Sequence, residues 1–354
     1  MIEIPDNAKI LLIRRDNIGD LLLTTPLIHT LRQRYPRARI DLLVNSYNAP
    51  IIQTNPDVNT IHVYTKGKHR GARSLAGIYL QRLKMYLTMR KVGYDLAILT
   101  TTHNPRRDYR LARSAGAKIM VGFSSGAEDS MRPLLQHPID NPWSGSLHLV
   151  EELAHITRAF GIDAQPGPLV LVPDALEVAK ARKRIGIPAG LVLGIHISAR
   201  KPPQRWPVER FSELIRRLHA DGQVGHFLLF WSPGPANHPQ HPGDDEKAAQ
   251  LLELTRGLPV TPFSTRHLPE LVAGLSLTDQ VICSDGGGMH VAAALGKPIL
   301  CFFGNSDPVV WHPWGVPHEL LRPASENVSN VSVEDTLEAW RRLNRNLESS
   351  STPR

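Results

Sequence analysis

Three polar segments that follow apolar runs carry the residue types needed for chemistry on a phosphorylated substrate. The first is KILLIRRDNIGDLLLTTPLIHTLR, residues 9–32, where Asp20 stands at a turn from a predicted strand to a predicted helix. In an open parallel sheet the carboxyl ends of the strands form the ligand crevice, so this carboxylate would face it. The alternative is that Asp20 only caps the helix. Asp16 lies earlier in the loop and is the poorer candidate.

The second segment is rich in glycine. SDGGGMHVAAALGKP, residues 284–298, follows the predicted strand QVICS. Successive glycines leave backbone N–H groups unobstructed, and a helix starting around Gly288 would add its positive end, which suits a pyrophosphate. His290 could donate a hydrogen bond to a phosphate oxygen. Tight packing is the alternative, and the segment is not a P-loop because no GK[ST] follows.

The third segment is ISARKPPQRWPVERF, residues 197–211, which supplies a hydroxyl and two cations, Ser198, Lys201 and Arg205. These groups suit a leaving diphosphate. We expect Trp206 to pack against the start of the next helix. A fourth segment, FFGNSDPVVWHPWG at 302–315, places Asn305, Ser306 and Asp307 at the same crevice or, alternatively, in a structural turn.

Two further features predict no chemistry. The loop NHPQHPGDDE at 237–246 contains His238 and His241, but its spacing fits no standard zinc site, and we expect a solvated loop. Cys283 and Cys301 each lie in an apolar run, which predicts buried, unreactive thiols. No metal site is predicted.

The segments lie within alternating strand and helix patterns, which predict an α/β fold with parallel sheets covered by helices. We predict strands starting at Lys9, Arg39, Thr60, Tyr94, Lys118, Leu191, His226, Gln280 and Pro298. We predict helices at about 20–35, 75–92, 106–115 and 147–160, one from Pro207 to Gly222, and one after a capping Ser332. Residues 161–173 concentrate Gly and Pro and are the predicted linker.

A chain of 354 residues is long enough for two domains. We predict one at 1–165 and one at 174–330, with a helix and tail at 331–354 packing back toward the first. The composition is that of a globular protein, without a membrane-spanning run or a secretory signal, so we expect a cytoplasmic location. The net charge of +8 indicates an anionic partner: nucleic acid, an acidic membrane or a phosphorylated substrate. The basic residues are scattered, which disfavours nucleic acid.

In order along nearly the whole chain, these segments resemble glycosyltransferase family 9, the ADP-heptose:lipopolysaccharide heptosyltransferases. The resemblance rests on Gly19 and Asp20 with Thr24, Thr25 and Pro26, on RWPVERF at 205–211, and on the segment 284–308. It implies a GT-B fold, in which two Rossmann-like domains with parallel sheets face a central cleft. It also implies inverting transfer of heptose from ADP-heptose to the lipopolysaccharide inner core, onto Kdo or heptose linked to lipid A, with no cofactor or metal required.

The same resemblance implies roles for individual residues. Asp20 would be the general base, Asp285 would lie near the donor sugar and pyrophosphate, and an acid around Glu246 would bind the ribose. The donor-binding candidates are Ser198, Lys201, Arg205, Glu246, Asp285, Gly286, Gly287, Gly288, Met289 and His290. The acceptor or loop candidates are Arg15, Asn17, Gly19, Thr24, Asn305 and Asp307. The enzyme would act peripherally at the cytoplasmic face of the anionic inner membrane, without binding nucleic acid.

One departure from the family pattern concerns a cation. Family members commonly carry a lysine two places before the Trp of the RWP segment, where this chain has Gln204. Either Lys201 or Arg205 takes over that role, or the phosphate contact is altered. The alternatives are a related transferase with another sugar nucleotide or another acceptor, such as a protein or small metabolite, and a non-catalytic basic protein that binds nucleic acid.

Overall fold

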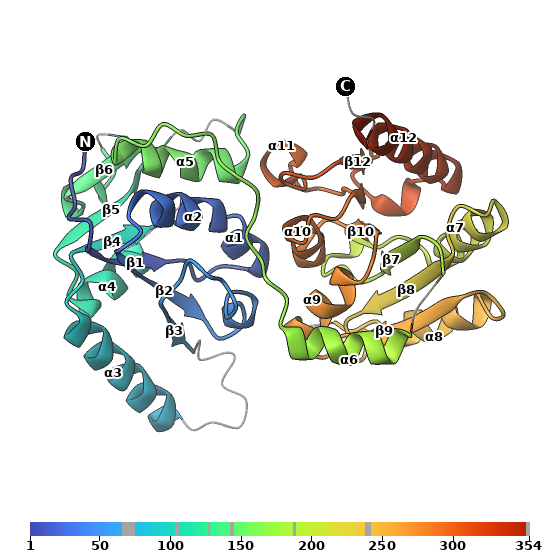
Figure 1. The fold of residues 1–354 in the computed structure, drawn as a ribbon, viewed down its shortest axis with the longest axis horizontal. Coiled ribbons are helices and arrows are strands. Elements are labelled where there is room, and N and C mark those ends of the chain that lie inside the picture. The colour runs from blue at the N-terminus through green and yellow to red at the C-terminus, as the bar shows by residue number, and fades with distance from the viewer. Residues whose placement is uncertain are drawn as a thin grey trace. The chain divides into compact units, whose positions relative to one another are not determined.

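The apolar runs of the sequence form two six-stranded parallel sheets, each in its own part of the chain (Figure 1). The computed structural model describes residues 1–65, 75–102, 106–126, 128–141, 145–186, 189–237 and 242–351. The chain divides into two compact units, Met1–Val170 and Leu171–Arg354. No helix within the described ranges is long and apolar enough to cross a bilayer.

The first unit is built on strands β1 to β6, which all pair in parallel in the order β3-β2-β1-β4-β5-β6. Their bounds are Lys9–Ile13, Arg39–Asn45, Thr60–Tyr64, Leu96–Leu99, Ile119–Ser124 and His137–Asp140. This is the strand order of dinucleotide-binding folds, and it reverses between the neighbouring strands β1 and β4. The loops that follow these two strands therefore lie side by side at the ligand-binding edge.

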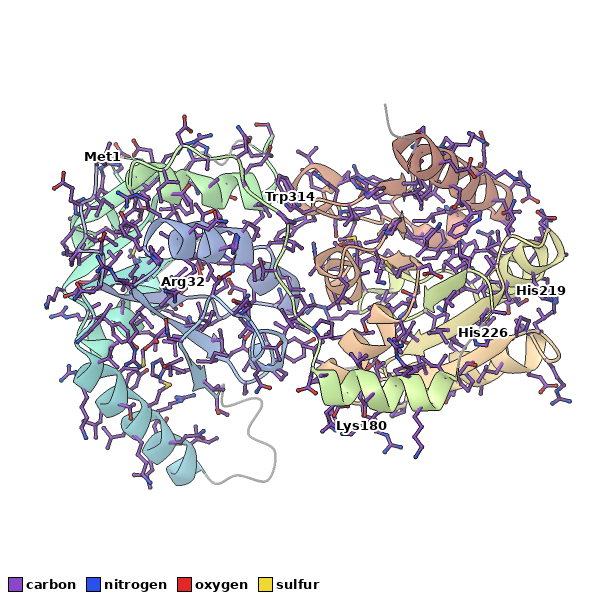
Figure 2. The ribbon with its side chains drawn as sticks, viewed as in Figure 1. Met1, Arg32, Lys180, His219, His226 and Trp314 are labelled. Carbon is purple, nitrogen blue, oxygen red and sulfur yellow. The ribbon has the colours of Figure 1, made fainter. Side chains whose placement is uncertain are left out.

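Helices cover both faces of this sheet (Figure 1). They are α1 (Ile18–Leu22), α2 (Thr25–Arg34), α3 (Leu75–Val92), α4 (Arg106–Ala115) and α5 (Leu149–Ala159), with short 3-10 turns at Ala49–Ile51 and Arg132–Leu134. Helices α3 and α4 share a core with one face of β1 and β4, and α2 packs on α5. Arg32 of α2 donates to the carbonyls of Asp57 and Ala38, which fastens the helix to the loops around β2 (Figure 2).

The second unit repeats the topology with strands β7 to β12 in the order β12-β11-β10-β7-β8-β9. The strands are Val192–His196, His226–Trp231, Val260–Ser264, Gln280–Ser284, Ile299–Phe302 and His318–Leu321. Here the order reverses between β7 and β10. Its helices are α6 (Ala175–Ile185), α7 (Val208–Ala220), α8 (Asp245–Leu254), α9 (Leu268–Ser276), α10 (Gly287–Ala294), α11 (Pro308–Trp311) and α12 (Val333–Ser351), with 3-10 turns at Pro202–Gln204 and Val328–Asn330.

Helices α7, α8 and α12 contribute to one apolar core with β7, β8, β10 and β11. Trp206 is buried at its centre, stacked on Phe302 at 4.6 Å between ring centroids and edge-on to Phe211, as expected from its position before α7. Its indole N–H donates to the Val331 carbonyl at 2.9 Å. Because that acceptor lies just before α12, Trp206 links the start of α7 to the start of α12.

The predicted strands are all present, but three more exist, β6, β9 and β12. The single helix predicted at 20–35 is two helices, α1 and α2, because Pro26 cannot donate the backbone bond that a continuous helix would need. For the segment at 331–354, packing back toward the first domain stays a prediction. Its helix α12 places Leu337, Trp340 and Leu343 in the core of the second unit.

Replacing Trp340 tests this placement of α12. Trp340→Ala empties a fully buried site and leaves Gln223, which accepts its indole N–H at 3.1 Å, without that donor. We expect a loss of about 3–5 kcal/mol in the unfolding free energy of the second unit, measured by urea titration. Arg345→Ala, an exposed change on the same helix, is the control. Equal midpoints for the two variants would contradict the assigned packing.

Candidate active site

The carboxylate of Asp20, in the short helix α1 that follows β1, is held on both oxygens. Arg14 donates from Nη2 to Oδ1 at 3.0 Å, and the backbone N–H of Asn17 donates to Oδ2 at 2.9 Å. Asp20 is therefore both a helix-capping residue, the alternative considered from the sequence, and one partner of an ion pair. A carboxylate has about four acceptor positions, so each oxygen can accept one more hydrogen bond.

Arg14 is buried and joins the two loops at which the first sheet reverses. Besides Asp20, its guanidinium donates to the carbonyl of Thr100, which follows β4. Asp16 lies 3.6 Å from its Nε. Burial raises the pKa of Asp16, with the Arg14 charge lowering it and the nearby Asp20 and Asp108 charges raising it. The Arg14 cation thus serves two carboxylates, of which Asp20 has the closer contact.

A third carboxyl near Arg14 comes from α5. Glu152 is fully buried, and neither of its oxygens has a hydrogen-bond partner among the described residues. Burial raises its pKa to about 7, although the Arg14 charge lowers it. A buried carboxyl without partners is unfavourable when ionised. Glu152 is therefore a group near the Arg14–Asp20 pair whose charge depends on pH.

The other N-terminal candidates mainly build the loop. The Thr24 hydroxyl donates to the Asp20 carbonyl at 2.8 Å, and the Gly19 carbonyl accepts the N–H of Leu23 at 2.9 Å. Arg15 donates to buried Asp108 of α4, with Nε 2.7 Å from the carboxylate oxygen. Asn17 caps α1 and is exposed. These contacts hold Asp20 in place rather than adding a second reactive group.

In the second unit, the glycine segment forms the turn from β10 into α10. Gly286 has φ of +153°, a conformation that side chains disfavour, and it precedes a helix whose first turn includes Gly287 and Gly288. A Cβ at Gly288 would lie 3.2 Å from the His196 ring, so the ring approaches this turn closely. The free N–H groups and helix dipole at this start favour an anion.

Asp285 is buried beside this turn and is tied to the third and fourth segments. Gln204 donates from Nε2 to Oδ2 of Asp285 at 2.8 Å and to the Ser306 hydroxyl at 3.3 Å. The amide that replaces the lysine of the family pattern thus has a defined partner. Gln204 connects the loops after β7, β10 and β11, three neighbouring strands.

The two predicted cations differ in availability. Arg205 donates from Nε to the Ala199 carbonyl at 2.9 Å, and its Nη1 lies 3.3 Å from the buried carboxylate of Asp244. Lys201 is exposed and makes one long contact, 3.5 Å, to Asn305. Lys201 is the better placed of the two to reach a phosphate, since Arg205 is engaged in holding its own loop.

Two side chains not singled out from the sequence complete the donor-side loops. Lys247 of α8 donates to the carbonyls of Ile197 and Trp206 at 3.2 and 2.8 Å, and burial lowers its pKa to about 8. His196 ends β7, and burial lowers its pKa to about 4, partly offset by the Asp244 charge. His196 is therefore neutral near pH 7, and its imidazole can donate or accept one hydrogen bond at the glycine turn.

Comparison with known proteins identifies this arrangement. The family model described as glycosyltransferase family 9 (heptosyltransferase) matches residues 82–341, more than half of the chain. The chain belongs to glycosyltransferase family 9. Lipopolysaccharide heptosyltransferase 3 of Escherichia coli K12 is 28% identical over 84% of this chain and 82% of its own length. Lipopolysaccharide heptosyltransferase 2 of the same strain is 25% identical over 85% of this chain and 84% of its own length.

Solved structures show that the fold is of the GT-B type. A glycosyltransferase family 9 protein from Veillonella parvula matches with a TM-score of 0.81 at 20% identity, covering 98% of this chain and 99% of its own. The E. coli heptosyltransferase WaaC with ADP matches with a TM-score of 0.76 at 18% identity over 95% and 99% of the two chains. The membership of this family that the sequence predicts is confirmed, and the protein is a glycosyltransferase.

Several predicted site residues of this family 9 enzyme have contacts that restrict their roles. Met289 is fully buried with its sulfur 3.2 Å from that of Cys301, so it can offer a ligand only its backbone. His290 is also buried, with its ring 6.4 Å from Trp311. Asp307 caps α11 through the N–H of Val309 at 2.9 Å, as in the structural alternative. The Ser198 hydroxyl accepts the N–H of Ser232 at 2.9 Å.

The acidic loop is only partly as predicted. His238 and His241 lie outside the described residues. The acids are not all in a solvated loop: Asp244 is buried, and Asp245 accepts from the Trp231 indole at 2.7 Å. Glu246 is exposed in the first turn of α8. No group of three or more His, Cys, Asp or Glu among the described residues is arranged to hold a metal ion.

Both cysteines are free and buried, on paired positions of β10 and β11, and burial raises the pKa of Cys301. The prediction that both thiols are buried is confirmed. The residues that sequence reasoning missed are Arg14, Glu152, His196 and Lys247. Two of these had a usable signal, because Arg14 and His196 come at the ends of the strands where the sheets reverse.

Glu152→Gln should stabilise the protein in a pH-dependent manner. The folded-state pKa of about 7 exceeds the usual 4.5, so the folded state binds the proton more tightly and stability falls as pH rises from about 4.5 to 7. The neutral amide removes that loss. We expect the variant to melt higher than wild type at pH 8 and the gap to shrink toward pH 5, in thermal scans. Exposed Glu3→Gln is the control, and a gap independent of pH would contradict the assignment.

Proposed function

We propose that this enzyme is an inverting heptosyltransferase that transfers heptose from ADP-heptose to the lipopolysaccharide inner core. Membership of glycosyltransferase family 9 and the relatives named lipopolysaccharide heptosyltransferase support the substrate class. The observation that carries the proposal is the pair of switch-point loops. The loop after β1 in the first unit presents a held carboxylate, and the loop after β10 in the second presents a glycine-lined helix start.

In this proposal Asp20 is the general base. It accepts the proton of an acceptor hydroxyl while that oxygen forms a bond to the anomeric carbon, and the bond from this carbon to the ADP oxygen breaks. Inversion follows because attack and departure occur on opposite faces. Arg14 and Asn17 fix the direction of the carboxylate, which leaves its remaining acceptor positions for the substrate.

The departing diphosphate carries the charge that must be stabilised. The N–H groups at the start of α10, from Gly287 onward, offer fixed dipoles at no cost of reorganisation during reaction. Lys201 adds an exposed cation. Asp285 directly precedes the glycine turn and is held by Gln204. Its carboxylate is suited to accept a hydrogen bond from a hydroxyl of the donor sugar. This set of groups supports the proposal that the reaction needs no metal or cofactor.

The acceptor is a lipid, which places the reaction at a membrane. We propose that the enzyme acts at the cytoplasmic face of the inner membrane, where its net charge of +8 favours anionic lipid and the phosphates of lipid A. A family 9 transferase with another sugar nucleotide or acceptor is the remaining alternative. The hypothesis of a non-catalytic protein that binds nucleic acid does not fit membership of a transferase family.

Asp20→Ala should reduce transfer by about 10³- to 10⁵-fold, because both proton removal and positioning of the acceptor depend on this carboxylate. The assay is incubation with ADP-heptose and a series of truncated lipopolysaccharides, with the product identified by mass. ADP binding should be nearly unchanged, since the donor loops lie in the second unit. Asp6→Ala, at an exposed pair with Arg37, should keep full activity. Full activity of Asp20→Ala would remove Asp20 from the mechanism.

Nucleotide choice is tested by thermal shift with ADP, UDP and GDP. ADP at 100 times its dissociation constant should stabilise the folded protein by about 2.7 kcal/mol. UDP and GDP at the same concentration should stabilise it by less. Gly286→Val should lose the ADP shift, because a side chain at φ of +153° distorts the turn into α10. Gly167→Val, with open space around its position, is the control. A larger thermal shift with UDP or GDP would contradict ADP-heptose as the donor and indicate a donor that carries that nucleotide.

A further inference from the structure

Helix α3 exposes an apolar face that none of the described residues covers. Of ten exposed large hydrophobic side chains among the described residues, four lie on this helix: Tyr79, Leu80, Leu83 and Leu87, each 52–65% exposed. At 100° per residue the three leucines fall within an arc of about 60°. They form a continuous stripe along the helix, which a single exposed leucine would not.

The opposite face of α3 is already used by the core. Ile78 and Met89 are buried, and Met89 packs with β1, β4 and α4 in one apolar cluster. The helix is therefore anchored to the sheet and apolar on two sides. In Figure 1 it lies next to α4 in the first unit. Core packing accounts for one apolar face and leaves the leucine stripe without a structural reason.

Positive charge surrounds the stripe. Beside the stripe α3 carries Lys84, Arg90 and Lys91, and its sequence contains no acidic residue. Its fourth cation, Arg82, lies on the other face, where it donates to the Thr65 carbonyl at 2.7 Å. Its neighbour α4 places Arg106, Arg107, Arg110 and Arg113 on its exposed face, while its only acid, Asp108, is buried against Arg15. Arg90 links the two helices by donating to the Ser114 carbonyl at 2.9 Å. The four arginines of α4 look scattered in the sequence, but helical periodicity gathers them onto one face of that helix.

We infer that this surface, the leucine stripe of α3 with the exposed arginines of α4, docks the enzyme on an anionic phospholipid bilayer. Leucines can enter the boundary of the acyl chains while the cations contact headgroup phosphates, which is how an interfacial amphipathic helix binds. The inference rests on the proposed function only in that a membrane-bound acceptor gives such docking a purpose.

Charge argues against a second copy of the chain as the occupant. A two-fold contact would place the same patch on both subunits, and here each patch carries an excess of cations that would face each other. A nucleic acid would match the charge but would leave the leucines facing phosphates. An anionic bilayer satisfies both the apolar stripe and its basic border.

The test is co-sedimentation of the full-length protein with vesicles of phosphatidylethanolamine and phosphatidylglycerol, and with phosphatidylcholine vesicles as the neutral reference. Leu80→Ser/Leu83→Ser/Leu87→Ser should weaken binding to the anionic vesicles at least about tenfold. Arg107→Gln/Arg110→Gln/Arg113→Gln should weaken it and flatten its salt dependence. The matched control is Leu134→Ser/Val172→Ser/Leu176→Ser, which removes exposed apolar side chains elsewhere and should bind as wild type.

A labelled variant provides a second measurement that does not depend on removing the stripe. The two native cysteines are buried, so Leu83→Cys can be labelled selectively with an environment-sensitive fluorophore. Its emission should shift to the blue with anionic vesicles, whereas the same label at Leu176→Cys should not respond. The inference would be overturned if the leucine and control variants bound the anionic vesicles equally, or if the label showed no blue shift. It would also be overturned if the wild type formed a dimer that the leucine substitutions dissociate.

Activity separates this inference from the proposed function. The leucine variant should keep wild-type turnover on a deacylated, water-soluble acceptor and lose turnover on acceptor embedded in vesicles. No heptose transfer to either acceptor by the wild type, with vesicle binding intact, would refute the proposed function and leave the docking surface standing. Normal transfer with no vesicle binding would refute the docking surface alone.

Discussion

The structure depends on the burial of parallel strands on both faces. Strands such as β1 and β10 are almost wholly apolar and covered by helices, so polar chemistry can occur only where they end. The order of each sheet then decides which ends meet. Because both sheets reverse beside their first strand, the loops after β1 and β4, and those after β7 and β10, become neighbours. Every side chain that takes part in the proposed transfer comes from such a loop or from a helix that follows it.

Within this framework, the first unit holds a charge cluster that a single buried arginine organises. Arg14 contacts Asp20, the Thr100 carbonyl and Asp16. Its charge also lowers the pKa of nearby Glu152, against the larger effect of burial. Breaking a buried pair by removing one partner is strongly unfavourable, so the cluster keeps Asp20 in one orientation. In the second unit the carboxylate of Asp285 is held instead by the neutral amide of Gln204, and a separate ion pair joins Arg205 to Asp244.

The sequence predicts central elements better than peripheral ones, for a physical reason. The missed strands β6, β9 and β12 are at sheet edges or half-exposed, and two of them contain proline, Pro138 and Pro262. Edge strands need neither continuous apolar residues nor every N–H, so they lack the pattern that marks β1 or β10. Candidate site residues can be recognised in the sequence where they lie in the turn or the first helix after a strand, as do Asp285 and Asp20. Glu152 and Lys247 reach their loops from helices distant in sequence, through packing that no local pattern records.

The position of α12 has a consequence for how the protein is made. Domains fold as units during synthesis, and the first unit occupies one continuous stretch that emerges before the second. The second unit differs, because the face of its sheet under α12 stays uncovered until Leu337, Trp340 and Leu343 have left the ribosome. During that interval apolar surface from β11 and α7 is open to the solvent. Until α12 has been synthesised, the nascent second unit therefore exposes apolar surface to which a chaperone can bind.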